Sequence, residues 1–228
     1  MSKAFVKDDA GTDDDDDVAL PELPAGVRNY ITPAGYQRIK DELLQLIDVD
    51  RPEFIVGGTI WEGRRLYDLY AEAMTPWEWH KPIFDYANSK GMLAFSSPFD
   101  LTAVEFLESL NVPCYKIASF ENSDHALLTA VARTGKPVIM STGMATQTEL
   151  AESVEVLRKH GCNQLILLKC TSHYPADPVD ANLATIPHLA QLFNCQVGLS
   201  DHTAGIGVAV ASVVLGATVI EKHFVLDR

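Results

Sequence analysis

The strongest constraint on the fold is an alternation of short apolar segments with helical patterns through most of the chain. Each apolar segment is rich in branched aliphatic side chains and ends in polar or turn-forming residues, after which apolar residues recur at helical spacing. We expect strands centred near Leu93, Tyr115, Ile139, Leu167, Val197 and Val219. The helices expected between them span 101–110, 123–133, 149–159, 183–193 and 206–215. Successive strand–helix units build a parallel sheet, and six of them predict a (β/α) barrel.

Composition narrows the class of protein. The 228 residues, 47% of them hydrophobic, are enough for one sizeable domain. A net charge of −13 argues against nucleic acid or an anionic membrane as a partner. No apolar run is long enough to cross a bilayer, and the acidic N-terminus is unlike a signal peptide, so we expect a cytoplasmic location. The dispersed cysteines are expected to be buried free thiols.

The N-terminal part of the sequence lacks the strand–helix alternation. The acidic run from Asp13 to Asp17 repels itself, so residues 1–25 are expected to be a disordered leader. Thr32 and Pro33 suit a helix start, and apolar spacing predicts a helix over 32–48 within a helical segment 26–53. Further helices are expected over 64–73 and 77–90, in a partial barrel domain that spans 54–228.

Polar side chains follow each of the six predicted strands. Any one of them is weak evidence, since Ser and Thr often cap the next helix, but six sets at one end of a barrel favour a catalytic site. The candidates are Ser97 after the first strand, Lys116, Ser119 and Glu121 on and after the second, Ser141 after the third, Ser172 and Tyr174 after the fourth, Ser200 and His202 after the fifth, and His223 after the sixth.

The chemistry of these residue types leaves alternatives open. His202 and His223 on neighbouring strand ends suit two ligands of a divalent metal, or are simply hydrogen-bonded histidines. Lys116 with several hydroxyls suits a phosphate site, or Lys116 is a Schiff-base nucleophile. Glu121 suits an acid, a base or a sugar-hydroxyl ligand, or is a surface glutamate, and Tyr174 is a substrate contact or a packed aromatic. We expect Lys169, inside an apolar strand, to form a structural ion pair.

Five motifs together carry a family resemblance: K-I-A-S, S-T-G-M-A-T, K-C-T-S-H-Y-P, S-D-H-T and I-E-K-H-F. They resemble the sialic acid synthase (NeuB) family over about residues 54–228, and T-P-W-E-W-H, F-S-S-P-F-D and K-I-A-S-F-E are most similar to its pseudaminic acid branch. The resemblance implies condensation of phosphoenolpyruvate with an N-acylated amino-hexose to a nonulosonic 2-keto acid. The neuraminate-forming branch is the alternative. It also implies a homodimer.

The resemblance carries roles to positions of this sequence. His202 and His223 match metal ligands, usually for Mn²⁺ or Mg²⁺, and Glu121 and Tyr174 match residues near the amino-sugar. With Lys116, His202 and His223, Glu121 also makes up the expected catalytic set. The positions that match phosphoenolpyruvate ligands are Ser97, Lys116, Ser119, Ser141, Ser172 and Ser200.

Some motifs of the family have no recognisable counterpart in this sequence. The first two barrel strands, with their glutamate and lysine, and the C-terminal antifreeze-like domain are not recognised, so we expect strands three to eight of the barrel and turnover close to background. Residues 26–53 resemble instead the start of a GreB-type transcript-cleavage factor, which implies RNA polymerase as a partner under that alternative.

Overall fold

The computed structural model of the chain describes residues 63–65, 68, 72 and 74–224. The acidic leader, the helix expected over 32–48 and most of the helix expected over 64–73 lie outside these residues. The chain divides into two compact units, with a boundary between Trp79 and His80. In the first, Arg65 pairs with Asp68 at 2.8 Å. The domain boundary expected at residue 53 stays a prediction.

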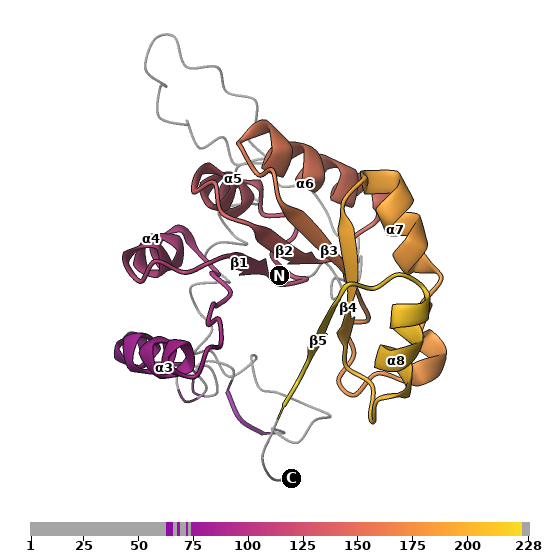
Figure 1. Cartoon of the computed structure of the whole chain (residues 1–228), viewed down its shortest axis with the longest axis horizontal. Coiled ribbons are helices and arrows are strands. Elements are labelled where there is room, and N and C mark those ends of the chain that lie inside the picture. Colours follow the sequence, from indigo (N-terminus) through magenta and orange to yellow (C-terminus); the bar gives the residue numbers. More distant parts are fainter. Residues whose placement is uncertain (1–62, 66–67, 69–71, 73, 225–228) are drawn as a thin grey trace, which may run out of the picture. The chain divides into compact units, whose positions relative to one another are not determined.

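The larger unit is built on a sheet of five parallel strands in chain order (Figure 1). Each strand pairs with the next one along the chain, as expected when a helix connects each pair. The strands are β1 (Tyr115–Ile117), β2 (Val138–Ser141), β3 (Leu165–Cys170), β4 (Gln196–Asp201) and β5 (Val219–Lys222). This arrangement confirms the predicted α/β class, an incomplete parallel barrel.

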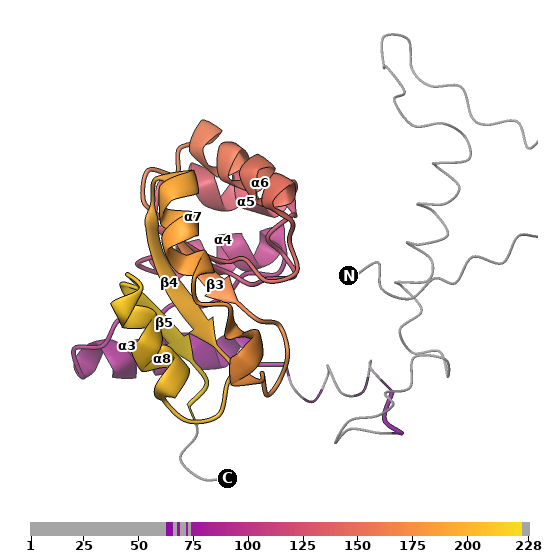
Figure 2. The same cartoon turned by 90° about the vertical axis from the view of Figure 1, so that its right-hand side faces the viewer.

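The helices follow the predicted pattern closely. Figure 2 shows the same unit from the side, with the helices packed along the sheet. All the predicted helices from residue 77 onward are present, with ends that differ by a few residues at most. They are α3 (Trp77–Ser89), α4 (Leu101–Ser109), α5 (His125–Arg133), α6 (Gln147–Lys159), α7 (Thr185–Phe193) and α8 (Gly207–Val214), with a short 3₁₀ helix, η2 (Pro178–Ala181), before α7.

Local side-chain chemistry explains where three of these helices begin. Asp100 accepts a hydrogen bond from the Ala103 N–H at 2.7 Å at the start of α4. Asp124 accepts one from the Leu127 N–H at 2.9 Å at the start of α5. Thr146 forms a reciprocal capping box with residue 149 at the start of α6. Such caps satisfy N–H groups that have no partner within the helix, so they fix the loops that follow β2 and precede α5.

The hydrophobic core lies between the sheet and its helices. Side chains alternate along a strand, so the residues that join the core define the outer face of the sheet, which faces the helices. On the strands these core residues are Tyr115, Ile117, Val138, Met140, Leu165, Leu167, Val197 and Leu199. The alternate residues define the inner face, and they include Lys116, Ser141, Cys170, Ser200 and Glu221. By the same alternation, the side chains of Lys169 and Asp201 lie on the outer face.

The strand predicted near Leu93 is not formed. Residues 92–98 adopt no regular structure, and the Leu93 side chain is 76% exposed. The segment still touches the sheet, because the Lys116 N–H donates to the Ser96 carbonyl at 3.4 Å. A strand here would have β1, only three residues long, as its neighbour, and the exposed apolar run gains little from burial. Of the six predicted strands, the first is therefore wrong.

The sheet also curves strongly. In a flat sheet β1 and β5 would lie about 19 Å apart, four inter-strand spacings. Yet Lys116 on β1 and Glu221 on β5 are within 3.4 Å of each other through their side chains. The inner face is therefore concave, as in an arc of a barrel. A close approach of β4 to β5 contributes, since a Cβ at Gly198 would lie 2.2 Å from the Val219 carbonyl oxygen.

Among the helices in the described ranges, none combines the length and the apolar character that a membrane span requires.

Candidate active site

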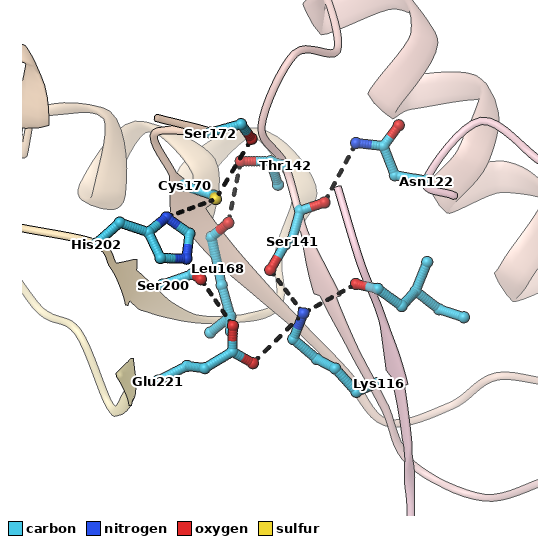
Figure 3. Close-up of polar contacts among 11 residues, drawn as sticks. Lys116, Asn122, Ser141, Thr142, Leu168, Cys170, Ser172, Ser200, His202 and Glu221 are labelled. Carbon is cyan, nitrogen blue, oxygen red and sulfur yellow. Dashed lines mark hydrogen bonds and ion pairs between the residues drawn. The ribbon is translucent and has the colours of Figure 1, made fainter. Parts of the chain in front are cut away.

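Lys116 lies at the centre of a polar cluster on the inner face. Its ammonium donates to the Ser141 Oγ at 2.8 Å and to the Ile117 carbonyl at 3.1 Å. It also forms an ion pair with Glu221, at 3.4 Å between Nζ and Oε2 (Figure 3). Lys116 is only 7% exposed, so the positive charge is held on the concave face and partly neutralised there. Lys116 therefore points to the inner face of the sheet, away from the helix layer.

Glu221 links Lys116 to the next strand. The Ser200 hydroxyl donates to Glu221 Oε1 at 2.7 Å, while Oε2 faces Lys116. Ser200 and Ser141 are 3% and 2% exposed, and their hydroxyls are held by Glu221 and Lys116 respectively. A continuous set of polar contacts thus runs from Ser141 through Lys116 and Glu221 to Ser200. Glu221 is not among the candidates named from the sequence, although it lies two residues before His223.

Two further hydroxyls meet above Gly143, in the loop between β2 and α6. A Cβ at Gly143 would lie 2.3 Å from the Ser172 Oγ and 2.8 Å from the Ser119 Oγ, so a larger residue here would displace both hydroxyls. Buried Asn122 fixes this loop by donating to the Ser141 and Gly143 carbonyls, each at 3.2 Å. Asn122 and Gly143 are site residues that the sequence did not single out, although Asn122 directly follows Glu121.

The two histidines come together as predicted. Their ring centroids are 5.3 Å apart, and the Tyr174 ring lies 4.1 Å from His202 and 5.7 Å from His223. His202 Nδ1 lies 2.9 Å from the Thr171 carbonyl oxygen. A carbonyl only accepts, so Nδ1 carries a proton, and in the neutral tautomer this leaves the Nε2 lone pair available to a metal. This orientation by a backbone carbonyl is typical of histidines that ligate metals.

Glu121 follows β1 and is half-buried. Its Oε2 is buried without a hydrogen-bond partner among the described residues. Burial raises the pKa of the Glu121 carboxyl above its ordinary value, while the charge of Lys116 acts in the opposite direction. A carboxyl in such a place holds a proton more readily than an exposed one. Glu121 is therefore suited to proton transfer or to a hydrogen bond with a substrate hydroxyl.

An ion pair on the outer face holds the two histidine-bearing ends together. Lys222 donates to the buried Asp201 carboxylate at 2.6 Å and to the Thr203 carbonyl at 2.8 Å. Burial pushes the pKa of Asp201 upward, but hydrogen bonds from Lys222 and Thr203 outweigh it and hold that pKa below its ordinary value. Because Asp201 precedes His202 and Lys222 precedes His223, this pair fixes the spacing of the histidines.

The remaining predicted residues are placed less tightly. Ser97 is half-buried and follows Ser96, whose carbonyl accepts a hydrogen bond from β1. Within the described residues, the Ser97 side chain forms no hydrogen bond. Tyr174 is 59% exposed, so it is not a packed core aromatic. The structural ion pair predicted for Lys169 is wrong. Within the described part of the chain its ammonium bonds to the Thr171 hydroxyl and the Asp180 carbonyl, because the outer face brings no carboxylate within reach.

Several known proteins are similar to this chain. It is 47% identical over 212 residues to pseudaminic acid synthase of Campylobacter jejuni, covering 93% of this chain and 62% of that protein. It is also 47% identical over 175 residues to pseudaminic acid synthase of Helicobacter pylori, covering 77% of this chain and 52% of that protein. The chain thus spans less than two thirds of these relatives.

A solved structure shares the fold. The N-acetylneuraminic acid (sialic acid) synthetase from Leptospira borgpetersenii matches with a TM-score of 0.68 and 34% identity, over 70% of this chain and 56% of that one. The NeuB family model matches residues 34–228. That match begins inside the segment 26–53, whose resemblance to GreB-type factors finds no support in these comparisons. With its motifs, its strand order and this match in agreement, the chain belongs to the NeuB family.

Proposed function

We propose that this chain contributes the barrel of a synthase that condenses phosphoenolpyruvate with an N-acylated amino-hexose to give a nonulosonic 2-keto acid. The pseudaminic acid synthases among its relatives support the sugar class. The observation that carries the proposal is the buried cation of Lys116, hydrogen-bonded to Ser141, at the strand ends where His202 and His223 meet. A cytoplasmic location and a homodimer belong to the same proposal.

The reaction balances with water as the third reactant. A carbon–carbon bond forms between the methylene of phosphoenolpyruvate and the aldehyde carbon of the open-chain sugar. Water adds to the cationic carbon that bears the phosphate ester, and that carbon–oxygen bond then breaks. The products are the 2-keto acid and inorganic phosphate, so phosphate release reports turnover.

The position of Lys116 supports a role in binding phosphoenolpyruvate, whose carboxylate and phosphate are both anionic. Lys116 is a buried cation on the inner face. The hydroxyls of Ser119 and Ser172 converge nearby, over the backbone of Gly143. Hydroxyls and an ammonium are suitable donors to phosphate or carboxylate oxygens. Before substrate binds, Glu221 offsets the Lys116 charge, and Ser200 holds Glu221 in place. An arriving anion therefore competes with Glu221 for Lys116.

The same end of the sheet provides groups for the sugar. Glu121, whose pKa is raised by burial, is placed to exchange a proton with the sugar aldehyde oxygen or to bind a hydroxyl. Tyr174 presents an exposed ring beside both histidines, and sugars commonly pack on aromatic faces with their apolar side.

The two histidines fit a divalent metal, for which we propose Mn²⁺ or Mg²⁺. The free Nε2 of His202 and the neighbouring His223 ring supply two nitrogen ligands. No cluster of three or more possible ligands occurs among the described residues, so water or substrate oxygens would complete the coordination. When bound, the metal supplies Lewis acidity toward the sugar aldehyde.

The test is phosphate release from phosphoenolpyruvate with each of three amino-sugars, the precursors of pseudaminic, legionaminic and neuraminic acids, in the presence of Mn²⁺. We expect the pseudaminic precursor to give the highest kcat/KM, and His202→Ala to abolish release. His125→Ala removes an exposed histidine at the start of α5 and is the matched control.

Two outcomes would overturn the proposal. One is phosphate release that His202→Ala leaves unchanged. The other is the absence both of release and of phosphoenolpyruvate binding by calorimetry. A preference for the neuraminic precursor would instead support N-acetylneuraminate synthase, the second candidate, which the Leptospira structure favours.

A further inference from the structure

A second cavity lies on the opposite face of the sheet from the proposed active site. It is an open cavity with a volume of about 590 Å³, lined by residues of β3, α6, α7 and the loop after β2. Lys169 of β3 lines it, and the outward orientation of Lys169 follows from strand alternation, since its neighbour Cys170 faces His202 on the inner side. The volume is within the range typical of small-molecule sites.

Lys169 is a buried cation without a carboxylate partner. It is 8% exposed, and its ammonium donates to the Thr171 hydroxyl at 2.5 Å and to the Asp180 carbonyl at 3.5 Å. Among the described residues no carboxylate lies within ion-pair distance, and the Asp180 side chain acts on it only from further away. Buried charges in proteins are normally paired or bound to a ligand, because their desolvation is costly. One ammonium hydrogen and the net charge thus remain to be satisfied.

The cavity wall indicates what kind of ligand would satisfy them. None of the residues that line it is acidic. Besides Lys169, the wall carries His188 from α7 and the uncharged polar side chains of Thr142, Gln147 and Thr185. The remaining wall is mainly apolar, including Met144, Leu150, Leu189, Leu192 and Phe193. An apolar pocket with one buried cation suits an anion that carries an apolar body.

We propose that the cavity between α6 and α7 binds a small organic carboxylate, with its anionic group on Lys169 and its apolar part against α7. The occupied ammonium would exchange its weak contact with the Asp180 carbonyl for a charge-assisted hydrogen bond. Burial lowers the pKa of Lys169, which is consistent with a cation that lacks a counter-charge until the ligand arrives.

This site is separate from the proposed active site but shares its backbone. In the loop after β2, Ser141 and Gly143 face the inner cluster, whereas Thr142 and Met144 line the cavity. A ligand in the cavity therefore contacts the same loop from behind. The binding proposal does not depend on the synthase activity, because Lys169 and the residues of α7 take no part in the proposed catalysis and binding is tested without turnover.

The test is calorimetric titration of the full chain at pH 7 with sodium hexanoate, hexanol and inorganic phosphate as probes. We expect hexanoate to bind, and hexanol and phosphate each to bind at least about tenfold more weakly, since one lacks the charge and the other the apolar body. Equal affinity for hexanoate and hexanol would overturn the proposal, as would stronger binding of phosphate than of hexanoate.

Two variants locate the site. Lys169→Met should lower hexanoate affinity about tenfold or more, the value of one hydrogen bond to a charged group. Ala184→Leu, at the start of α7, fills part of the cavity and leaves Lys169 intact, and should also weaken binding, so the test survives if Lys169→Met does not fold. Lys159→Met, which removes an exposed lysine at the far end of α6, is the control. Unchanged affinity in Ala184→Leu and in folded Lys169→Met would exclude this cavity.

Discussion

Lys116 and Lys169 are equally buried, at 7% and 8% exposure, yet they lie on opposite faces of one sheet and have different partners. Lys116 contacts the Glu221 carboxylate and the Ser141 hydroxyl on the concave face. Among the residues that the structure describes, Lys169 forms hydrogen bonds with a hydroxyl and a carbonyl on the helix side. The difference shows that burial alone does not decide what a lysine contributes to stability or function. The charge of the partner decides it, and the following predictions test that view.

The largest effect is expected from Lys116→Met. The substitution leaves the Glu221 carboxylate without its cation. We expect a loss of about 2–3 kcal/mol in the free energy of unfolding, slightly less than for fully buried pairs because Glu221 is 40% exposed. Urea denaturation at pH 7 measures it. Lys136→Met breaks a less buried pair with Glu108 and should cost at most about 1 kcal/mol. Equal losses in the two variants would contradict the comparison.

A double-mutant cycle sharpens the assignment of this loss to Glu221. Glu221→Gln keeps an acceptor for the Ser200 hydroxyl but removes the charge. We expect Lys116→Met and Glu221→Gln to be non-additive by about 1–2 kcal/mol in the free energy of unfolding, as is usual for groups in direct contact. Additive losses would show that Lys116 acts mainly through Ser141.

For Lys169→Met we expect no comparable loss in the free energy of unfolding. Replacing a buried cation that lacks a carboxylate with an apolar side chain of similar length removes a desolvation cost. The free energy of unfolding should therefore stay within about 1 kcal/mol of the original protein or exceed it. A loss as large as that of Lys116→Met, measured in the same urea series, would mean that the contacts with Thr171 and Asp180 stabilise Lys169 more than we infer.

The pH dependence gives the smallest and most specific signal. Burial lowers the pKa of Lys169 in the folded protein below its ordinary value of 10.5. The unfolded chain then binds the proton more tightly, so the protein gains stability as pH rises toward 10.5 and loses it as pH falls through the folded pKa. We expect the protein to gain stability relative to Lys169→Met between pH 7 and pH 10 in urea denaturation. A constant difference would contradict the lowered pKa.

Most of the fold could be predicted from local sequence. The strands β1 to β5 and the helices from α3 to α8 follow from apolar patterns and from caps such as Asp100 and Asp124, all of which act within a few residues. The segment around Leu93 carries the same pattern but forms no strand, because strand formation needs a paired and buried neighbour. Local pattern does not report whether such a neighbour exists.

The candidate site could be predicted in part. Strand-end position predicted that Lys116, Ser141 and Ser200 lie at one end of the sheet and that His202 lies near His223. Contacts within the loops were harder to foresee. Gly143 matters because two hydroxyls converge on it from other strand ends, which no local pattern shows.

The sequence by itself determined the order of the elements, the face to which each strand residue points and the family to which the chain belongs. These follow from short-range periodicity and from motifs that are contiguous in the chain. Only the tertiary structure decided the partners of the charged groups. Curvature of the sheet brings Glu221 of β5 to Lys116 of β1, residues that are distant along the chain, and packing of α6 and α7 leaves Lys169 beside a cavity. Electrostatic interaction depends on distance in space, so the sequence supplied the charges and the fold decided which of them meet.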